Sequence, residues 1–311
     1  MLAGAKEGAS VKVTVYEVGP RDGLQYLPHI VDTKNKRLLI KALYDAGVEN
    51  IEEVSFAHPK IIPQMADAEK VFTGKGAGLV MNKRGFDRAM ATGVEKVNIV
   101  LSPCETFNMR SFRMTRSELV FHYHSFLNKY PKEKVRVYIS MAFGSPYSGL
   151  FDEDILKSCI IDAKLFGNTV VFSDTVGIGD KNQIKQMARL ALKESLIPAL
   201  HLHHKGDESR PLTLVRAGLL AGIKQFDASI GGLGGCPMVE GSGSNLSTET
   251  LVRHLNAWGF ESGIDENRLD DALKIVRKIK QEPMLAIPTL SASNLPKQFQ
   301  VKYPITSQVI L

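Results

Sequence analysis

NTVVFSDTVGIGDKNQIKQMARLALKESLIPALHLHH, residues 168–204, contains the pattern that decides the fold. Two short runs rich in β-branched and apolar residues, 168–173 and 197–204, enclose a stretch at 180–196 whose apolar residues recur at helical spacing. Continuous apolar strands are typical of a parallel sheet that is covered by helices, and strand–helix–strand is its repeating unit. The segment therefore predicts two neighbouring parallel strands joined by a helix.

The same unit repeats along the chain. Further strand-like runs occupy 11–18, 50–56, 78–81, 97–101, 135–142 and 225–230, and further helical stretches occupy 32–47, 152–167 and 209–222. The interval between the third and fourth runs is the shortest, so it leaves room for only a brief helix. Eight strands that alternate with helices predict a (β/α)8 TIM barrel.

The last part of the chain departs from this rhythm. The helical and strand periodicity is lost after about residue 280, where four prolines follow, at positions 283, 288, 296 and 304. We therefore predict a catalytic barrel domain over 1–280 and an irregular C-terminal tail over 281–311. Three roles for the tail are compatible with the sequence: it packs on the barrel, it covers the barrel mouth as a lid, or it binds a partner.

Composition excludes several classes of protein. The chain has 311 residues, 44% of them hydrophobic, and only three scattered cysteines, which is too few for a disulfide framework. No signal-peptide core and no apolar run of membrane-spanning length occurs, and no nucleic-acid-binding motif is present. We expect a cytoplasmic protein that binds neither membrane nor nucleic acid. The net charge of +6 favours a polyanionic ligand such as a nucleotide-bearing thioester, or reflects only a basic surface.

Polar residues gather where the predicted strands end. Catalytic residues of TIM barrels lie at the C-terminal ends of the strands. In this chain those positions hold Arg21, Asp22, Glu52, Ser55, Asp174, Thr175, His201, His203, Cys236 and Asn245. The active site is therefore expected at this end of the barrel.

His201 and His203 suggest a metal site. Residues i and i+2 of a strand share one face, so the two imidazoles point together. They bind a divalent cation, or they are a pair of hydrogen-bonded or solvated histidines. Asp22 could add a carboxylate oxygen and Asn245 an amide oxygen, although each also suits a turn or cap. A mixed nitrogen and oxygen set fits Mg or Mn and, less selectively, Zn, Co or Ni.

The segment 231–245, GGLGGCPMVEGSGSN, is rich in glycine and carries Cys236. Glycines allow close approach of the backbone and a loop that closes over a substrate, or they form a phosphate-binding turn or a merely flexible segment. A thiol beside a metal can act as a general acid or base once its pKa is lowered.

Five motifs together resemble the 3-hydroxy-3-methylglutaryl-CoA lyase family of the DRE-TIM metallolyase superfamily. They are VGPRDGLQ at 18–25, IEEVSF at 51–56, PQMAD at 63–67, SDTVGIG at 173–179 and GLGGCP at 232–237. The resemblance implies a metal-dependent carbon–carbon lyase that cleaves a 3-hydroxyacyl-CoA to acetyl-CoA and a β-keto acid, acetoacetate for the parent substrate. We also expect a homodimer.

The same resemblance assigns roles to individual residues. It implies that Asp22, His201, His203 and Asn245 bind the divalent ion, and that Arg21, Glu52, Asp174 and Cys236 are catalytic. We expect Gln25, Ser55, Tyr138 and Thr175 to contact the substrate. Two basic residues, Arg110 and Arg113, are expected to contact the CoA phosphates, unless they belong to an ordinary solvated face.

The chain departs from the family pattern at three places near the expected active site. His204-Lys205-Gly206 replaces the usual Asp-Thr after the H-x-H, which removes a group that would orient a ligand. The segments 26–28 and 144–147 also differ. Three alternatives therefore remain: a Claisen-condensing enzyme joining acetyl-CoA to a 2-oxo acid, an aldolase, and a catalytically silent barrel with a binding role.

Overall fold

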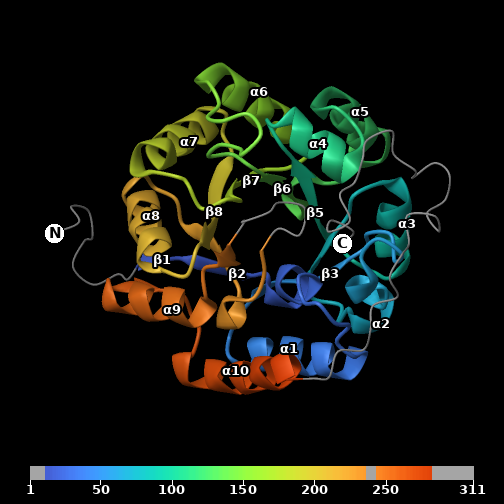
Figure 1. The fold of residues 1–311 in the computed structure, drawn as a ribbon, viewed down its shortest axis with the longest axis vertical. Helices are drawn as coiled ribbons and strands as arrows, with labels where there is room; N and C mark the ends of the chain where they lie inside the picture. Colours follow the sequence, from blue (N-terminus) through green and yellow to red (C-terminus); the bar gives the residue numbers. More distant parts are fainter. Residues whose placement is uncertain (1–10, 236–242, 282–311) are drawn as a thin grey trace.

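The structure is a computed structural model that describes residues 11–235 and 243–281. Its main sheet is a closed barrel of eight parallel strands, with β8 pairing β9 to complete the circle. The view in Figure 1 runs down this barrel, and helices form a ring around it. The barrel strands are β2 (Thr14–Glu17), β3 (Asn50–Ser55), β4 (Ala77–Leu79), β5 (Lys96–Leu101), β6 (Val135–Ile139), β7 (Thr169–Asp174), β8 (Ile197–His204) and β9 (Gln225–Ala228). The predicted TIM barrel is confirmed.

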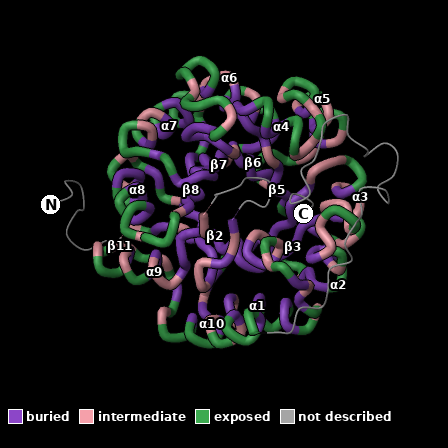
Figure 2. The backbone as a smooth tube through the Cα atoms, viewed as in Figure 1, coloured by how far each residue is buried: buried purple, intermediate pink, exposed green. Residues whose placement is uncertain are grey.

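Helices follow the barrel strands in the chain and cover the barrel. They are α1 (Thr33–Asp45), α2 (Ala68–Val71), α3 (Lys83–Ala91), α4 (Glu105–Phe112), α5 (Arg116–Leu127), α6 (Glu153–Lys164), α7 (Lys181–Lys193), α8 (Ser209–Leu220), α9 (Thr248–Ala257) and α10 (Glu266–Gln281). Single turns are η1 (Gly19–Gly23), η2 (Pro63–Met65), η3 (Lys132–Lys134) and η4 (Ile230–Gly232). Figure 2 shows that the strands and the inward faces of the helices are buried. None of these helices is both long and apolar enough to cross a bilayer.

Local sequence signals explain the helix boundaries. Asp32 caps α1 by accepting a hydrogen bond from the Asn35 N–H, and Gly47 follows the helix with a φ of 88°. Asp180 and Gln183 form a reciprocal capping box at the start of α7. These contacts satisfy backbone groups that the first turn of a helix leaves without partners. The predicted helices at 32–47 and 180–196 are therefore confirmed, with the cap residue just before each helix.

The first predicted strand, 11–18, is divided in the structure. Val11 and Lys12 form β1, which pairs in parallel with β11 (Phe260–Glu261) outside the barrel, and only β2 enters the barrel. A short strand, β10 (Ser244–Asn245), pairs antiparallel with the end of β8. The described part of the predicted domain 1–280 thus forms one barrel. The predicted tail lies, from residue 282 on, outside the described residues.

The Glu17 side chain joins the end of β2 to the segments that follow β9. Its Oε1 accepts hydrogen bonds from the N–H groups of Gly19 (2.7 Å) and Ile230 (3.0 Å), and its Oε2 accepts one from Thr248 Oγ1 (2.5 Å). The side chain is completely buried. Burial raises the pKa of Glu17 to about 7, although these three hydrogen bonds act in the opposite direction.

This pKa shift predicts a pH-dependent effect of Glu17→Gln on stability. The folded state holds the proton more tightly than the unfolded chain, so the contribution of Glu17 falls as pH rises from 4.5 to about 7. The full change corresponds to about 3 kcal/mol. Glutamine retains the contacts of the protonated acid, because its amide can donate to Thr248. We therefore compare the two proteins at each pH. The Tm of the variant minus the Tm of wild type is expected to increase by about 5 °C or more between pH 5 and pH 8. A difference in Tm that does not change with pH would contradict this.

Candidate metal centre and active site

Three predicted ligands meet at the C-terminal end of the barrel. Asp22 lies in η1 directly after β2, and His201 and His203 lie on β8. One ligand atom from each side chain lies within 4.8 Å of the others. Leu202 points away from them into the apolar core, as the strand alternation predicts. Residues that are about 180 positions apart in the sequence are adjacent because β2, β9 and β8 are consecutive strands of the closed barrel.

The two imidazoles are oriented as metal ligands. His203 Nδ1 lies 2.9 Å from the carbonyl oxygen of Thr175, and His201 Nδ1 lies 3.1 Å from Asp227 Oδ2. Both partners are hydrogen-bond acceptors, so each Nδ1 carries the ring hydrogen. Each Nε2 therefore carries a lone pair. These two Nε2 atoms are only 3.0 Å apart. Two facing lone pairs repel each other unless a proton or cation lies between or beside them.

Asn245 lies beside this cluster and is held by its amide nitrogen. Its Nδ2 donates to Asp22 Oδ2 (2.8 Å) and to the carbonyl oxygen of Leu233 (2.9 Å), which settles the orientation of the amide. Its Oδ1 is buried and has no hydrogen-bond partner among the described residues. A buried acceptor without a partner is costly, and a cation would satisfy it. The donor set therefore fits a divalent metal ion.

Arg21 lies beside this cluster and is held by two carboxylates. Its Nη1 donates to Asp22 Oδ1 at 2.6 Å, and its Nε and Nη2 both contact Glu52 Oε2. Burial opposes the ionisation of Asp22, but Arg21 and the neighbouring imidazoles hold the pKa of Asp22 below its usual range. Glu52 is completely buried, and its other oxygen accepts a hydrogen bond from Asn98. Glu52 thus orients Arg21, and burial raises the pKa of Glu52 even though Arg21 opposes the rise.

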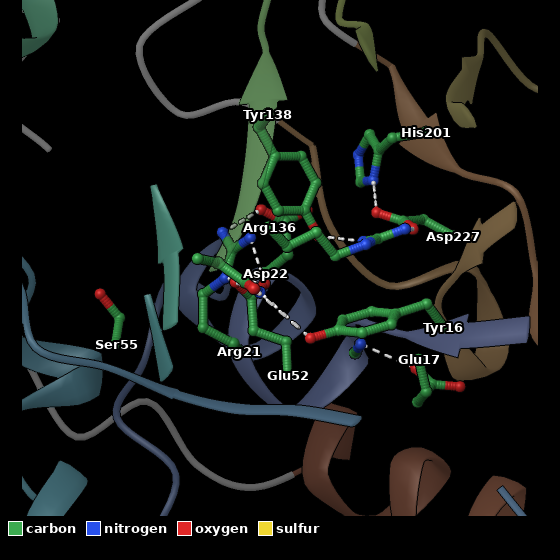
Figure 3. A network of polar contacts seen from close by, with 12 residues as sticks. Tyr16, Glu17, Arg21, Asp22, Glu52, Ser55, Arg136, Tyr138, His201 and Asp227 are labelled. Carbon is green, nitrogen blue, oxygen red and sulfur yellow. Dashed lines mark hydrogen bonds and ion pairs between the residues drawn. The ribbon is translucent and has the colours of Figure 1, made fainter. Parts of the chain in front are cut away.

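Sequence reasoning missed a buried polar layer beneath the metal ligands (Figure 3). Asp227 on β9 bridges His201 and Arg136, whose Nη2 donates to Asp227 Oδ1 at 2.7 Å. Burial opposes the ionisation of Asp227, yet Arg136 and His201 keep its pKa below the usual range. Arg136 also donates to Tyr138 Oη and stacks 4.0 Å from the ring centre of Tyr16. The sequence did contain a signal for this layer, namely a charged residue within a strand, as in VRVYI and QFDA.

Asp174 and Thr175 support the ligands indirectly. Both carboxylate oxygens of Asp174 accept backbone hydrogen bonds, from Ile178 (2.8 Å) and Gly179 (2.9 Å), and so shape the loop after β7. That loop presents the Thr175 carbonyl oxygen to His203, while Thr175 Oγ1 accepts a hydrogen bond from the Met141 N–H. Burial raises the pKa of Asp174.

The other predicted residues lie at varying distances from this centre. Tyr138 is buried and its ring packs edge-on against His201, with 6.0 Å between ring centres. Ser55 is buried but lies apart from the polar network in Figure 3, and its Oγ accepts from the Ala57 N–H. Gln25 is partly buried just beyond η1. Cys236 lies outside the described residues.

Arg110 and Arg113 lie on and just after α4, in the connection that follows β5. Arg110 donates to Tyr147 Oη at 3.0 Å and stacks over the Tyr147 ring, 4.6 Å from its centre. Arg113 ends the helix in the left-handed conformation, with a φ of 58°. No contact given by the structure joins either side chain to the described metal ligands.

Gly234 provides a test of how closely Asn245 must be held. Gly234 has a φ of +113°, and a Cβ added there would lie 2.3 Å from Asn245 Nδ2 and 3.0 Å from Asp22 Oδ2. We expect Gly234→Ala to displace the Asn245 amide and to raise the Kd for Mn²⁺ about 10-fold or more, measured by titration. Gly74→Ala is the matched control, because Gly74 also has a positive φ but nothing lies within 4 Å of its added Cβ. Equal Mn²⁺ affinities in the two variants would contradict the expectation.

The fold and the site can now be compared with known proteins. The HMGL-like family model matches residues 12–276. The mitochondrial hydroxymethylglutaryl-CoA lyase of Gallus gallus is 34% identical over 272 residues, which cover 84% of this chain and 91% of that protein. A 3-hydroxy-3-isohexenylglutaryl-CoA/hydroxy-methylglutaryl-CoA lyase of Pseudomonas aeruginosa is 32% identical over 271 residues, 84% of this chain and 90% of that protein.

A solved structure extends the similarity to three dimensions. An HMG-CoA lyase from Acinetobacter baumannii, in complex with coenzyme A and 3-methylmalate, superimposes with a TM-score of 0.81 at 30% identity. The match covers 94% of this chain and 98% of that one. The family match spans all eight barrel strands and the candidate metal ligands. The chain belongs to the HMGL-like family.

Proposed function

We propose that this protein is a metal-dependent carbon–carbon lyase that cleaves 3-hydroxy-3-methylglutaryl-CoA, or a close 3-hydroxyacyl-CoA, to acetyl-CoA and a β-keto acid. The observation that carries the proposal is the convergence of two imidazoles and a carboxylate at the barrel mouth, beside an amide whose oxygen has no hydrogen-bond partner among the described residues. The names of the relatives, which are hydroxymethylglutaryl-CoA lyases, support the same substrate class.

The reaction requires a proton to leave the substrate and another to return. A base of the active site takes the proton of the C3 hydroxyl, the C2–C3 bond breaks, and the bonding electrons form the enolate of the departing thioester. C3 becomes the keto carbon of the product, and protonation of the enolate carbon gives acetyl-CoA. A divalent ion held by Asp22, His201, His203 and Asn245 would act as a Lewis acid that makes the hydroxyl more acidic.

Arg21 is the residue placed to stabilise negative charge. Its guanidinium is buried and is fixed by Glu52 and Asp22, so it is preorganised before the charge develops. Such preorganised donors commonly contribute several kcal/mol to the transition state. We propose Cys236 as the proton donor to the enolate carbon, on the strength of its GLGGCP motif alone.

We propose Mg or Mn as the ion, because carboxylate and amide oxygens together with imidazole nitrogens suit these metals. A homodimer and a cytoplasmic location remain our proposals from the sequence. Cys104 and Cys159 are buried free thiols, which is compatible with a reducing compartment.

The CoA phosphates are proposed to contact Arg110 and Arg113. Reversing both charges to glutamate is expected to raise KM for the CoA substrate about 10-fold while kcat changes little, because the contacts are remote from the reacting bond. Steady-state kinetics measures both constants. Lys193→Glu is the control, because Lys193 is an exposed cation at the far end of α7. An unchanged KM in the double variant would remove these arginines from the substrate site.

A product assay separates the lyase from its alternatives. Purified protein with Mn²⁺ and hydroxymethylglutaryl-CoA is expected to release acetyl-CoA and acetoacetate in equal amounts. Release of free CoA from acetyl-CoA in the presence of 2-oxo acids would instead indicate a Claisen-condensing enzyme. Cleavage of free hydroxy acids without CoA would indicate an aldolase, and no turnover with no bound metal would indicate a silent barrel.

A further inference from the structure

The candidate ligand Asn245 lies on a very short strand. β10 contains only two residues, and its register places Ser244 opposite His204 and Asn245 opposite His203. The Asn245 amide nevertheless lies against a candidate ligand, because its Nδ2 donates to Asp22 Oδ2 at 2.8 Å. Something beyond the two-residue strand is needed to hold this backbone in place, since short pairings are weak by themselves.

The His204 ring supplies one such contact. The Gly206 N–H donates to His204 Nδ1 at 3.2 Å, so the ring hydrogen is on Nε2. His204 Nε2 lies 3.1 Å from the Asn245 carbonyl oxygen and therefore donates to it. An ionised carboxylate at this position would be acceptor-only and could not make this bond, so the contact requires a side chain that can donate a hydrogen.

Glu208 supplies a second contact from the same loop. Its Oε1 accepts a hydrogen bond from the Ser247 N–H at 2.6 Å, and its Oε2 accepts one from Thr250 Oγ1 at 2.7 Å. Its Oε1 also lies 3.7 Å from His204 Nε2. His204 and Glu208 therefore hold the chain on both sides of Leu246, directly after the candidate ligand.

We propose that His204 and Glu208 are positioning residues that fix the Asn245 backbone and so aim Asn245 Oδ1 at the metal ion. The inference rests on the proposed metal-dependent function. Outer groups that orient metal ligands commonly contribute about 10- to 100-fold to metal affinity. His204 performs this role through a hydrogen bond to the main chain, without contacting the ion.

The test is the Kd for Mn²⁺, measured without substrate on the full chain. We expect His204→Ala and, independently, Glu208→Ala to raise this Kd about 10-fold or more. His204→Gln is expected to restore it to within about 3-fold of wild type, because its amide can donate to the same carbonyl oxygen. His29→Ala is the matched control, because His29 Nε2 lies 3.0 Å from the Ile279 carbonyl oxygen, away from Asn245.

The outcomes separate this inference from the proposed function. A purely structural role would lower the Tm of the metal-free variants without changing the Kd, as we expect for His29→Ala. Wild-type affinity in folded His204→Ala and Glu208→Ala would overturn the inference and leave the proposed lyase intact. Failure of the wild-type protein to bind Mn²⁺ would overturn both.

Discussion

His203→Ala is expected to abolish Mn²⁺ binding and to reduce lyase turnover about 10³-fold or more. The Nε2 of His203 lies 3.0 Å from that of His201, and the two nitrogens together with Asp22 form the described ligand cluster. Loss of one nitrogen removes a direct ligand, and Lewis-acid stabilisation of the developing charge amounts to several kcal/mol. Each 1.4 kcal/mol, roughly, corresponds to a tenfold change in rate.

Two measurements are needed to interpret this variant. Elemental analysis after dialysis gives the metal content, and product formation from hydroxymethylglutaryl-CoA gives the rate. His124→Ala, an exposed histidine on α5, should leave both unchanged. Retention of one equivalent of tightly bound metal with near-normal turnover in His203→Ala would mean that this imidazole is only a buried structural group.

Arg21→Met is expected to lower kcat about 10³-fold while the Kd for Mn²⁺ changes much less. Removing one preorganised donor to a developing oxyanion commonly costs about 10²- to 10³-fold in kcat, and Arg21 carries a full charge. Arg21→Lys should recover only part of the loss, because lysine cannot reproduce the planar contacts that Arg21 makes with Glu52 and Asp22.

The single substitution leaves Glu52 buried without its cationic partner, which by itself destabilises the fold. The double variant Arg21→Met/Glu52→Gln removes both charges and is expected to regain thermal stability but not activity. Comparison of Tm, Mn²⁺ affinity and kcat for the single and double variants separates stability from catalysis. Recovery of near-normal kcat in the double variant would show that Arg21 does not stabilise the transition state.

Much of the fold was predictable because barrel strands are buried on both faces. Runs such as VVFS and IPALHLHH are continuous and apolar, and their C-terminal ends carry the polar residues. The division of 11–18 into two strands was not predictable, because it depends on β1 pairing with Phe260 and Glu261, about 250 residues away. Local sequence gives no information about so distant a partner.

The candidate site was predictable only in part. Strand alternation placed His201 and His203 on one face, and barrel closure brought Asp22 beside them. Asp227 was missed because only residues at strand ends were considered, and Asp227 lies within β9. Its carboxylate nevertheless orients His201. Asp174 was expected to be catalytic, and that role stays a prediction; in the structure its two oxygens accept backbone hydrogen bonds that shape the loop after β7.

The most direct test of the account is a metal titration of the stripped protein. After treatment with a chelator and its removal, the chain should cleave hydroxymethylglutaryl-CoA at a negligible rate. Added Mn²⁺ should restore acetyl-CoA release in proportion to occupancy, reaching a plateau at one ion per chain. Full activity in the metal-free protein, or activity that does not follow metal uptake, would contradict a lyase centred on Asp22, His201, His203 and Asn245.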